Sequence, residues 1–143
     1  MSLMSTTDLE DFQNYRIDLH SHTKCSDGGL TPEELIDRAT NFQIDVLAIT
    51  DHDTVAAIDV ALKHIETNDL KLKLVKGIEI STSWQNFEIH IVGLNIDHNN
   101  PSLRKLIASQ QGAREERAKT MSEKLAKCGI ENAYDKAQTL AGE

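Results

Sequence analysis

The stretch "RIDLHSHTKCSDG", residues 16–28, determines how the rest of this sequence is interpreted. It begins as a β-strand pattern with Asp18, His20 and His22 at alternate positions, and Asp27 follows five residues later. Side chains two residues apart on a strand share a face, so the first three point the same way if the strand persists that far. Polar side chains are costly to bury without partners. The stretch therefore predicts a partner or ligand for these residues.

Strand and helix patterns alternate along the chain. The strand patterns cover residues 15–20, 45–50, 72–81 and 88–96, and the helical patterns cover residues 31–42, 54–67, 101–127 and, weakly, 132–140. This order predicts a parallel or mixed sheet with right-handed crossovers. Four strands are too few for a closed (β/α) barrel, which takes about 200–250 residues. The chain is therefore either a small open sheet or the first part of a longer protein.

Start and stop signals accompany the helical patterns. Thr31 is a good N-cap for the first helix, and Glu34 three residues later completes a capping box. For the second helix, Asp53 or Thr54 is the expected cap. The long third helix is expected to end near Gly129.

Further carboxylates and imidazoles lie at the ends of the strand patterns. His52 follows the second strand, Glu79 lies one position before the close of the third, and His90 lies near the start of the fourth. The carboxyl ends of parallel strands form the active face of α/β sheets. His90 reaches that face if the fourth strand runs antiparallel to the third, or if the loop between them re-aims it, and the sequence leaves both open.

These residue types indicate a metal centre. Histidine and carboxylate ligands without cysteine suit zinc, manganese or iron. Two or three such ions about 3.5–4 Å apart hold a phosphate ester, activate a water and stabilise the leaving oxygen. One His-x-His is weak evidence, but several histidines and carboxylates at neighbouring strand ends are much stronger.

Some of these polar residues have ordinary structural alternatives. Asp18 either orients a ligand histidine or makes a simple strand-end hydrogen bond, and Asp27 in "SDGG" also fits an Asx-turn. His64 in a helical pattern, His98 in a loop and Cys25 without a base beside it are expected to take no part in the site.

Composition narrows the function classes. The chain has 143 residues, of which 39% are hydrophobic and 27% charged, which suits one compact domain. The net charge of −8 argues against a broad nucleic-acid surface. No run approaches the length of a membrane span, and two distant cysteines without a zinc or redox spacing favour the cytoplasm. Residues 1–12 are expected to be a cloning leader and flexible N-terminus.

Taken together, the motifs resemble those of the polymerase-and-histidinol-phosphatase (PHP) family of metal-dependent phosphoesterases. The matching motifs are "DLHSHT", "SDG", "TDHD", "GIEIS" and "HIVG", within roughly residues 15–95. The resemblance implies the metal ligands His20, His22, Asp27, His52, Glu79 and His90. It also implies that Glu79 bridges two ions, and that Glu79, His52 and Asp27 are the residues most directly involved in catalysis.

The resemblance also implies the fold. The chain is expected to be the N-terminal portion of a distorted seven-stranded (β/α) PHP barrel, over residues 13–100, followed by the start of a helical insertion over residues 101–143. The family completes its site with a histidine before a proline and a later Asp-x-His, and neither occurs here. We therefore expect a truncated chain with an incomplete metal site, inactive alone, whose exposed half-barrel edges favour self-association.

The pattern looks most like the stand-alone bacterial branch that removes the 3′-phosphate from nucleoside 3′,5′-bisphosphates, close members of which also trim RNA from its 5′ end. This predicts a phosphohydrolase that uses two or three divalent ions (Mn, Fe or Zn) on a nucleotide or an RNA 5′ end. The alternatives are histidinol phosphate or DNA ends as substrate, a non-catalytic metal-binding domain, or another metal hydrolase such as an amidase.

Overall fold

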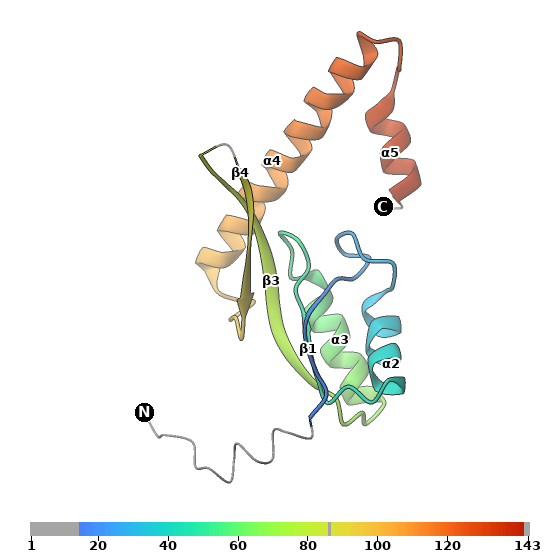
Figure 1. The fold of residues 1–143 in the computed structure, drawn as a ribbon, viewed down its shortest axis with the longest axis vertical. Coiled ribbons are helices and arrows are strands. Elements are labelled where there is room, and N and C mark those ends of the chain that lie inside the picture. The colour runs from blue at the N-terminus through green and yellow to red at the C-terminus, as the bar shows by residue number, and fades with distance from the viewer. Residues whose placement is uncertain (1–14, 86, 142–143) are drawn as a thin grey trace. The chain divides into compact units, whose positions relative to one another are not determined.

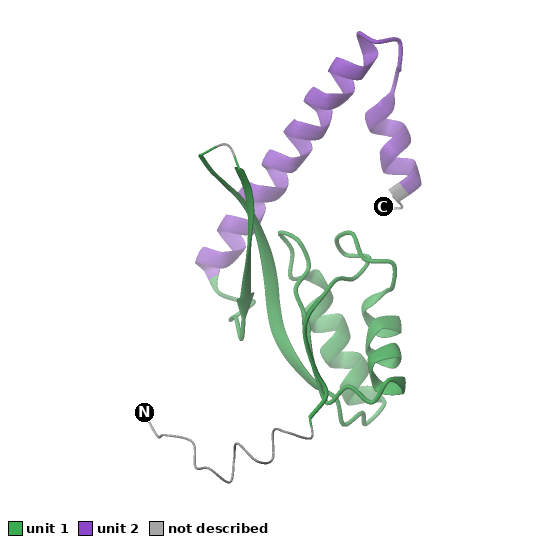
Figure 2. Ribbon diagram, viewed as in Figure 1, with its two compact units in different colours: residues 1–100 green, residues 101–143 purple. Residues whose placement is uncertain are grey.

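A computed structural model describes residues 15–85 and 87–141, so the predicted leader at residues 1–12 lies outside the described residues. The chain divides into two compact units, residues 1–100 and 101–143 (Figure 2). Across the described ranges, no helix is both long and apolar enough to cross a membrane.

The first unit is built on a four-stranded sheet of mixed direction (Figure 1). Its strands are β1 (Ile17–Ser21), β2 (Val46–Ile49), β3 (Lys73–Trp84) and β4 (Phe87–Leu94), in the spatial order β1-β2-β3-β4. The first three strands pair in parallel, and β4 runs antiparallel to β3. This arrangement confirms the predicted mixed sheet and settles the direction of the fourth strand.

Two helices provide the crossovers, α2 (Pro32–Asn41) and α3 (Ala56–Thr67). The capping box of α2 is present, because Thr31 Oγ1 accepts from the Glu34 amide and the Glu34 carboxylate accepts from the Thr31 amide. The N-cap position of α3 is Val55, which makes no side-chain capping bond, so neither Asp53 nor Thr54 occupies that position. Thr54 Oγ1 nevertheless accepts from the Ala56 amide at the start of α3, at 3.2 Å, whereas Asp53 Oδ1 accepts from the Ser81 amide of β3.

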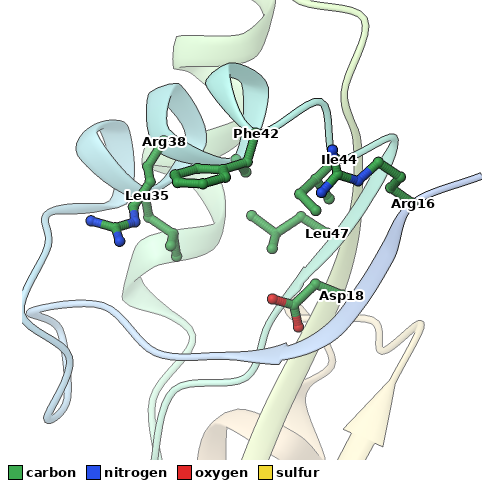
Figure 3. Close-up of a pocket in the computed structure, with 8 residues that line it drawn as sticks. Arg16, Asp18, Leu35, Arg38, Phe42, Ile44 and Leu47 are labelled. Carbon is green, nitrogen blue, oxygen red and sulfur yellow. The ribbon is translucent and has the colours of Figure 1, made fainter.

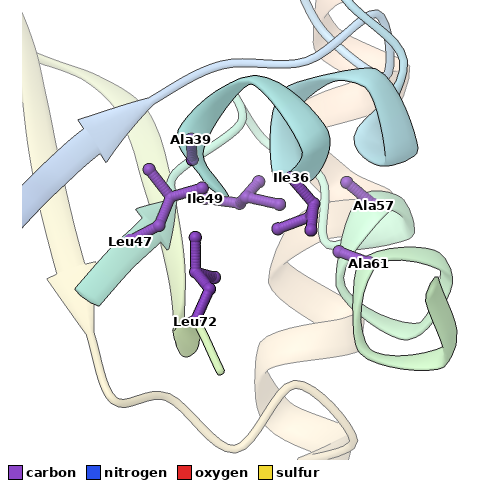
Figure 4. Packing of buried hydrophobic residues seen from close by; sticks show 7 residues of the cluster. All are labelled: Ile36, Ala39, Leu47, Ile49, Ala57, Ala61 and Leu72. Carbon is purple, nitrogen blue, oxygen red and sulfur yellow. The ribbon is translucent and has the colours of Figure 1, made fainter. Parts of the chain in front are cut away.

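The core of the first unit lies between the helices and the sheet (Figure 4). Its buried side chains come from α2, β2, α3 and the start of β3: Ile36, Ala39, Leu47, Ile49, Ala57, Ala61 and Leu72. Full burial of one large aliphatic side chain contributes about 1.5–3 kcal/mol. The small alanines let α2 and α3 approach the sheet closely. This packed face fixes the strands whose carboxyl ends carry the polar residues.

A bulge in β1 separates Asp18 from the histidines that follow it. Asp18 pairs with Leu47 and Ser21 pairs with Ile49, so β1 contains one residue more than β2 over this interval. A bulge of this kind re-aims the side chains beyond it. Asp18 lines a pocket beside α2 together with Leu47 (Figure 3), whereas His20 contacts the third strand. The shared face of Asp18 and the histidines, expected for an unbroken strand, is therefore lost at the bulge. Asp18 Oδ1 instead accepts from the His20 amide at 3.2 Å, which is the strand-end hydrogen bond given as the alternative.

The second unit consists of α4 (Pro101–Ala126) and α5 (Ala133–Ala141). Gly129 follows α4 with a φ of +86°, which only glycine adopts without strain, so the predicted end of the long helix is confirmed. The two helices are tied by a bond from the Tyr134 amide to Ser122 Oγ.

Candidate metal centre

Glu79 lies at the centre of a cluster of imidazoles. It is only 5% exposed. Its Oε2 lies 2.8 Å from His20 Nε2 and 3.2 Å from His22 Nε2, and its Oε1 lies 3.0 Å from His90 Nδ1. A single carboxylate thus faces one pair of histidines with one oxygen and a third histidine with the other.

His52 and Asp27 extend the cluster on one side. His52 Nε2 lies 3.8 Å from Glu79 Oε2 and 3.7 Å from Asp27 Oδ2, and His22 Nδ1 lies 3.6 Å from Asp27 Oδ1. The rings of His22 and His52 stack at 4.7 Å between centroids. All six residues predicted as ligands therefore come together in one site.

The strand pairing explains why they meet. β3 pairs in parallel with β2 only as far as Lys76, and from Gly77 onward it pairs with β4. Glu79 lies just past this change, level with the carboxyl ends of β1 and β2. His90 faces Ser81 across the antiparallel pair, which brings it beside Glu79.

The third strand is longer than its sequence pattern indicates. β3 continues to Trp84, so Glu79 lies in the middle of a twelve-residue strand and not one position from its close. The prediction failed because "STSW" has no apolar alternation, and β4 extends the strand by backbone pairing. Glu79 is therefore held more firmly than it would be at a strand end, because the backbone on both sides of it is paired.

Behind these residues, Asp51 holds a layer of hydrogen bonds that the sequence analysis missed. Asp51 Oδ1 accepts from the Thr23 amide and from Ser26 Oγ, both at 2.6 Å, and its Oδ2 accepts from Thr23 Oγ1 at 2.7 Å. The only available signal was an aspartate next to a predicted ligand, with threonine and serine in the preceding loop.

Three other histidine and carboxylate residues lie outside the ligand groups. Two of them make hydrogen bonds elsewhere in the fold, and the third lies beside His90. His64 Nε2 pairs with Asp37 at 2.7 Å, between α2 and α3. His98 Nε2 pairs with Asp59 at 2.9 Å. Glu88 Oε1 lies 3.6 Å from His90 Nε2, and its side chain is exposed.

Electrostatics favour an ionised Glu79. Burial raises the pKa of Glu79, but the hydrogen bond from His20 and the charges of His52, His20 and His22 together outweigh it, so the pKa lies below its ordinary value. Glu79 is therefore an anion facing histidines at neutral pH, and anionic carboxylates are the form that binds cations.

The donor set fits divalent metal ions. Three overlapping groups each place their ligand atoms within 4.8 Å of one another: His20, His22 and Glu79; His22, Asp27 and His52; and His52, Glu79 and His90. Among the described residues, three buried Nδ1 atoms have no hydrogen-bond partner, those of His22 and His52 in the cluster and that of His98 outside it. At His52 the nitrogen that faces Glu79 and Asp27 is Nε2, so it is the converging ligand atoms that indicate a metal. Imidazole and carboxylate donors in these numbers suit zinc, manganese or iron.

Comparison with known proteins identifies relatives of this arrangement. The model of the PHP domain family matches residues 18–140. The 5′-3′ exoribonuclease Rnm of Salmonella typhimurium is 50% identical over 130 residues, which are 90% of this chain and 44% of that protein. The 3′,5′-nucleoside bisphosphate phosphatase of Chromobacterium violaceum is 40% identical over 85% of this chain and 42% of that protein.

A solved structure shares the fold. An amidohydrolase from Chromobacterium violaceum, with bound sulfate and no metal, superimposes with a TM-score of 0.76 at 39% identity, over 84% of this chain and 42% of that one. The chain therefore spans less than half the length of these relatives, and the predicted partial barrel is confirmed. Because the family model covers most of its residues, the chain belongs to the PHP domain family.

Proposed function

We propose that this chain forms part of the metal centre of a phosphoesterase that acts on nucleotides. The observation that carries the proposal is Glu79, a nearly buried carboxylate with four imidazoles and Asp27 around it. The convergence of histidine and carboxylate ligand atoms within 4.8 Å of one another further supports a cation at this place.

The proposed ligands are His20, His22, Asp27, His52, Glu79 and His90, which would hold two or three divalent ions. When bound, such ions activate water and neutralise charge on a phosphate ester. The carboxylate of Glu79 links the two ends of the cluster, because its oxygens face different histidines.

The residues of the chain contribute position and charge to this chemistry. His52 belongs to two of the three ligand groups, and Asp27 belongs to one of those two. Glu79 and His22 also belong to two groups each. Among these ligands, the family resemblance gives Glu79, His52 and Asp27 the most direct part in catalysis. Asp27 has a side chain that is 69% exposed, so it forms the part of the site nearest to an entering substrate.

For the substrate, we propose the 3′-phosphate of nucleoside 3′,5′-bisphosphates, together with trimming of RNA 5′ ends. Support comes from relatives whose names are 5′-3′ exoribonuclease and 3′,5′-nucleoside bisphosphate phosphatase. Both kinds of reaction cleave a phosphate ester of a nucleotide. The net charge of −8 favours a local, metal-based recognition of phosphate over a broad basic surface.

We also propose different roles for the two parts of the chain. Residues 13–100 would supply the ligands, and residues 101–143 would begin a helical insertion. The remaining ligands of the centre would come from other parts of the complete protein, because the chain spans 44% of the Salmonella relative.

The test is phosphate release by the complete protein that carries this sequence. Loaded with manganese, it is expected to release phosphate from adenosine 3′,5′-bisphosphate, and the Glu79→Gln variant is expected to release none above background. A substrate panel with histidinol phosphate and 5′-phosphorylated DNA and RNA separates the alternatives. Tight metal uptake without hydrolysis of any member of the panel would show a non-catalytic metal-binding domain instead.

A further inference from the structure

We propose that Asp51 is a positioning residue that fixes the loop carrying Asp27, and that it thereby builds the ligand group of His22, Asp27 and His52. The inference rests on the proposed function, since it assigns a metal to that group. It concerns a residue that lies outside the proposed ligand set.

Asp51 has the burial and the contacts of a structural anchor. Asp51 is only 1% exposed. Burial of its carboxylate costs free energy unless the oxygens accept hydrogen bonds. Both of its oxygens accept bonds of 2.6–2.7 Å, and all three donors belong to the loop: the Thr23 amide, the Thr23 hydroxyl and the Ser26 hydroxyl. Bonds to an ionised acceptor are about twice as strong as neutral ones.

The anchored loop is short and tightly turned. The amides of Ser26 and Gly28 both donate to the carbonyl of Thr23, at 3.0 and 2.9 Å. Gly28 approaches the strand so closely that a Cβ there would lie 2.3 Å from the His22 carbonyl oxygen. The position of Asp27, between Ser26 and Gly28, is therefore set by the backbone of this turn.

Asp27 itself has little packing to hold it. Its side chain is 69% exposed, and the groups near its oxygens are the Ser26 hydroxyl at 3.5 Å and the His22 and His52 rings at 3.6 and 3.7 Å. Without the turn, an exposed aspartate would lose its orientation toward these rings. The carboxylate of Asp51 is what attaches the turn to the end of β2.

Asp51 also joins the other ligand-bearing segments. It immediately precedes His52, and its backbone carbonyl accepts from the Glu79 amide at 3.1 Å. His20 and Glu79, in contrast, lie within β1 and β3, which pair without help from the Asp51 side chain. Loss of that side chain should therefore weaken one ion position and leave the others in place.

The first measurement is calorimetric titration of the complete, metal-free protein with manganese. Asp51→Ala is expected to weaken one class of bound ion by about 10–100-fold, the usual effect of removing a group that orients a ligand, while the other class keeps its affinity. Asp51→Asn should restore binding to within about threefold, because its amide oxygen still accepts from Thr23 and Ser26 and the Thr23 hydroxyl can accept from its NH₂. Asp37→Asn, which alters a carboxylate paired with His64 between α2 and α3, is the matched control.

The second measurement is amide hydrogen exchange over residues 23–28 in the metal-free protein, which reads the loop independently of any metal. Asp51→Ala is expected to accelerate exchange there at least tenfold. Ser26→Ala removes one of the three hydrogen bonds to Asp51, from a half-buried position, and is expected to accelerate exchange by a smaller factor. This variant replaces Asp51→Ala in the measurement if Asp51→Ala does not fold.

The two measurements separate the inference from the function on which it rests. Equal weakening of every ion class, or unchanged loop exchange in Asp51→Ala or Ser26→Ala, would overturn the positioning role while hydrolysis by the unmodified protein still supports the proposed function. Failure of the unmodified protein to bind manganese would overturn both, even if the loop exchange changes as expected.

Discussion

Gly28 offers a sharp test of how closely the Asp27 loop must approach β1. In the change Gly28→Ala, the added Cβ would lie 2.3 Å from the His22 carbonyl oxygen and 2.7 Å from the Thr23 nitrogen. Both are backbone atoms, which cannot rotate away as a side chain can. The loop must therefore retreat by about 0.7 Å to reach even a 3.0 Å separation, and further for ordinary contact.

This retreat carries Asp27 with it. Asp27 lies next to Gly28, and its oxygens are 3.6–3.7 Å from the His22 and His52 nitrogens. A misplacement on the order of 1 Å costs about 100-fold in rate, so kcat/KM of the complete enzyme should fall by roughly that factor. Crowding of this kind also lowers the free energy of unfolding by about 1–3 kcal/mol.

Gly29 provides the control, since it is the next residue and a Cβ there would meet nothing within 4 Å. Steady-state kinetics on a nucleoside 3′,5′-bisphosphate, with urea unfolding in parallel, compare Gly28→Ala with Gly29→Ala. Gly29→Ala should match the unmodified protein in both measurements. If Gly28→Ala were as active as Gly29→Ala, the loop would not need its observed proximity to β1, and the reasoning would be refuted.

Three further predictions concern the centre and the core. Glu79→Gln should weaken manganese uptake in calorimetry by at least about tenfold, because the carboxylate belongs to two of the three ligand groups; unchanged uptake would contradict its central place. Dialysis against EDTA should lower the melting temperature of the complete protein, since saturation at about 100 Kd stabilises by about 2.7 kcal/mol per ion; an identical melting curve would argue against bound metal. Ile36→Ala should lower the free energy of unfolding by about 2–5 kcal/mol, because Ile36 is fully buried in the core, and a change below 1 kcal/mol in urea titration would show a core that re-packs freely.

The sequence was informative where local chemistry decides the structure. The capping box of Thr31 and Glu34 and the end of the long helix near Gly129 depend on neighbouring residues, and the structure contains both. The order of strands and helices followed from hydrophobic patterns that span one element each. The family resemblance then supplied the candidate ligands, which no periodicity could have provided.

The sequence was least informative where distant segments decide the structure. The bulge that separates the side chain of Asp18 from those of the histidines is seen only in the pairing of β1 with β2. Asp53 was expected to cap α3, but its carboxylate accepts from the Ser81 amide, and Ser81 is 28 residues away. Asp51 likewise bonds far along the chain, to Thr23 and Ser26, residues that precede it by 28 and 25 positions.

The point where β3 exchanges one partner strand for another explains why the ligands gather at Glu79. Gly77 marks this change, and a Cβ there would lie 2.8 Å from Thr50 Cγ2, 2.9 Å from the Ile49 carbonyl and 3.1 Å from the Gly93 carbonyl. β2 and β4 therefore both come close to β3 at this residue. Glu79 lies two positions further on and shares a face with Gly77.

From that position, one carboxylate can be reached from three directions. β1 and the residue that follows it supply His20 and His22, the segment after β2 supplies His52, and β4 supplies His90 from the opposite strand direction. If β4 ran parallel to β3, only residues at the carboxyl end of β4 would lie level with Glu79. The antiparallel turn from β3 to β4 instead brings His90 back from the strand's interior, so the mixed topology itself concentrates the imidazoles around Glu79.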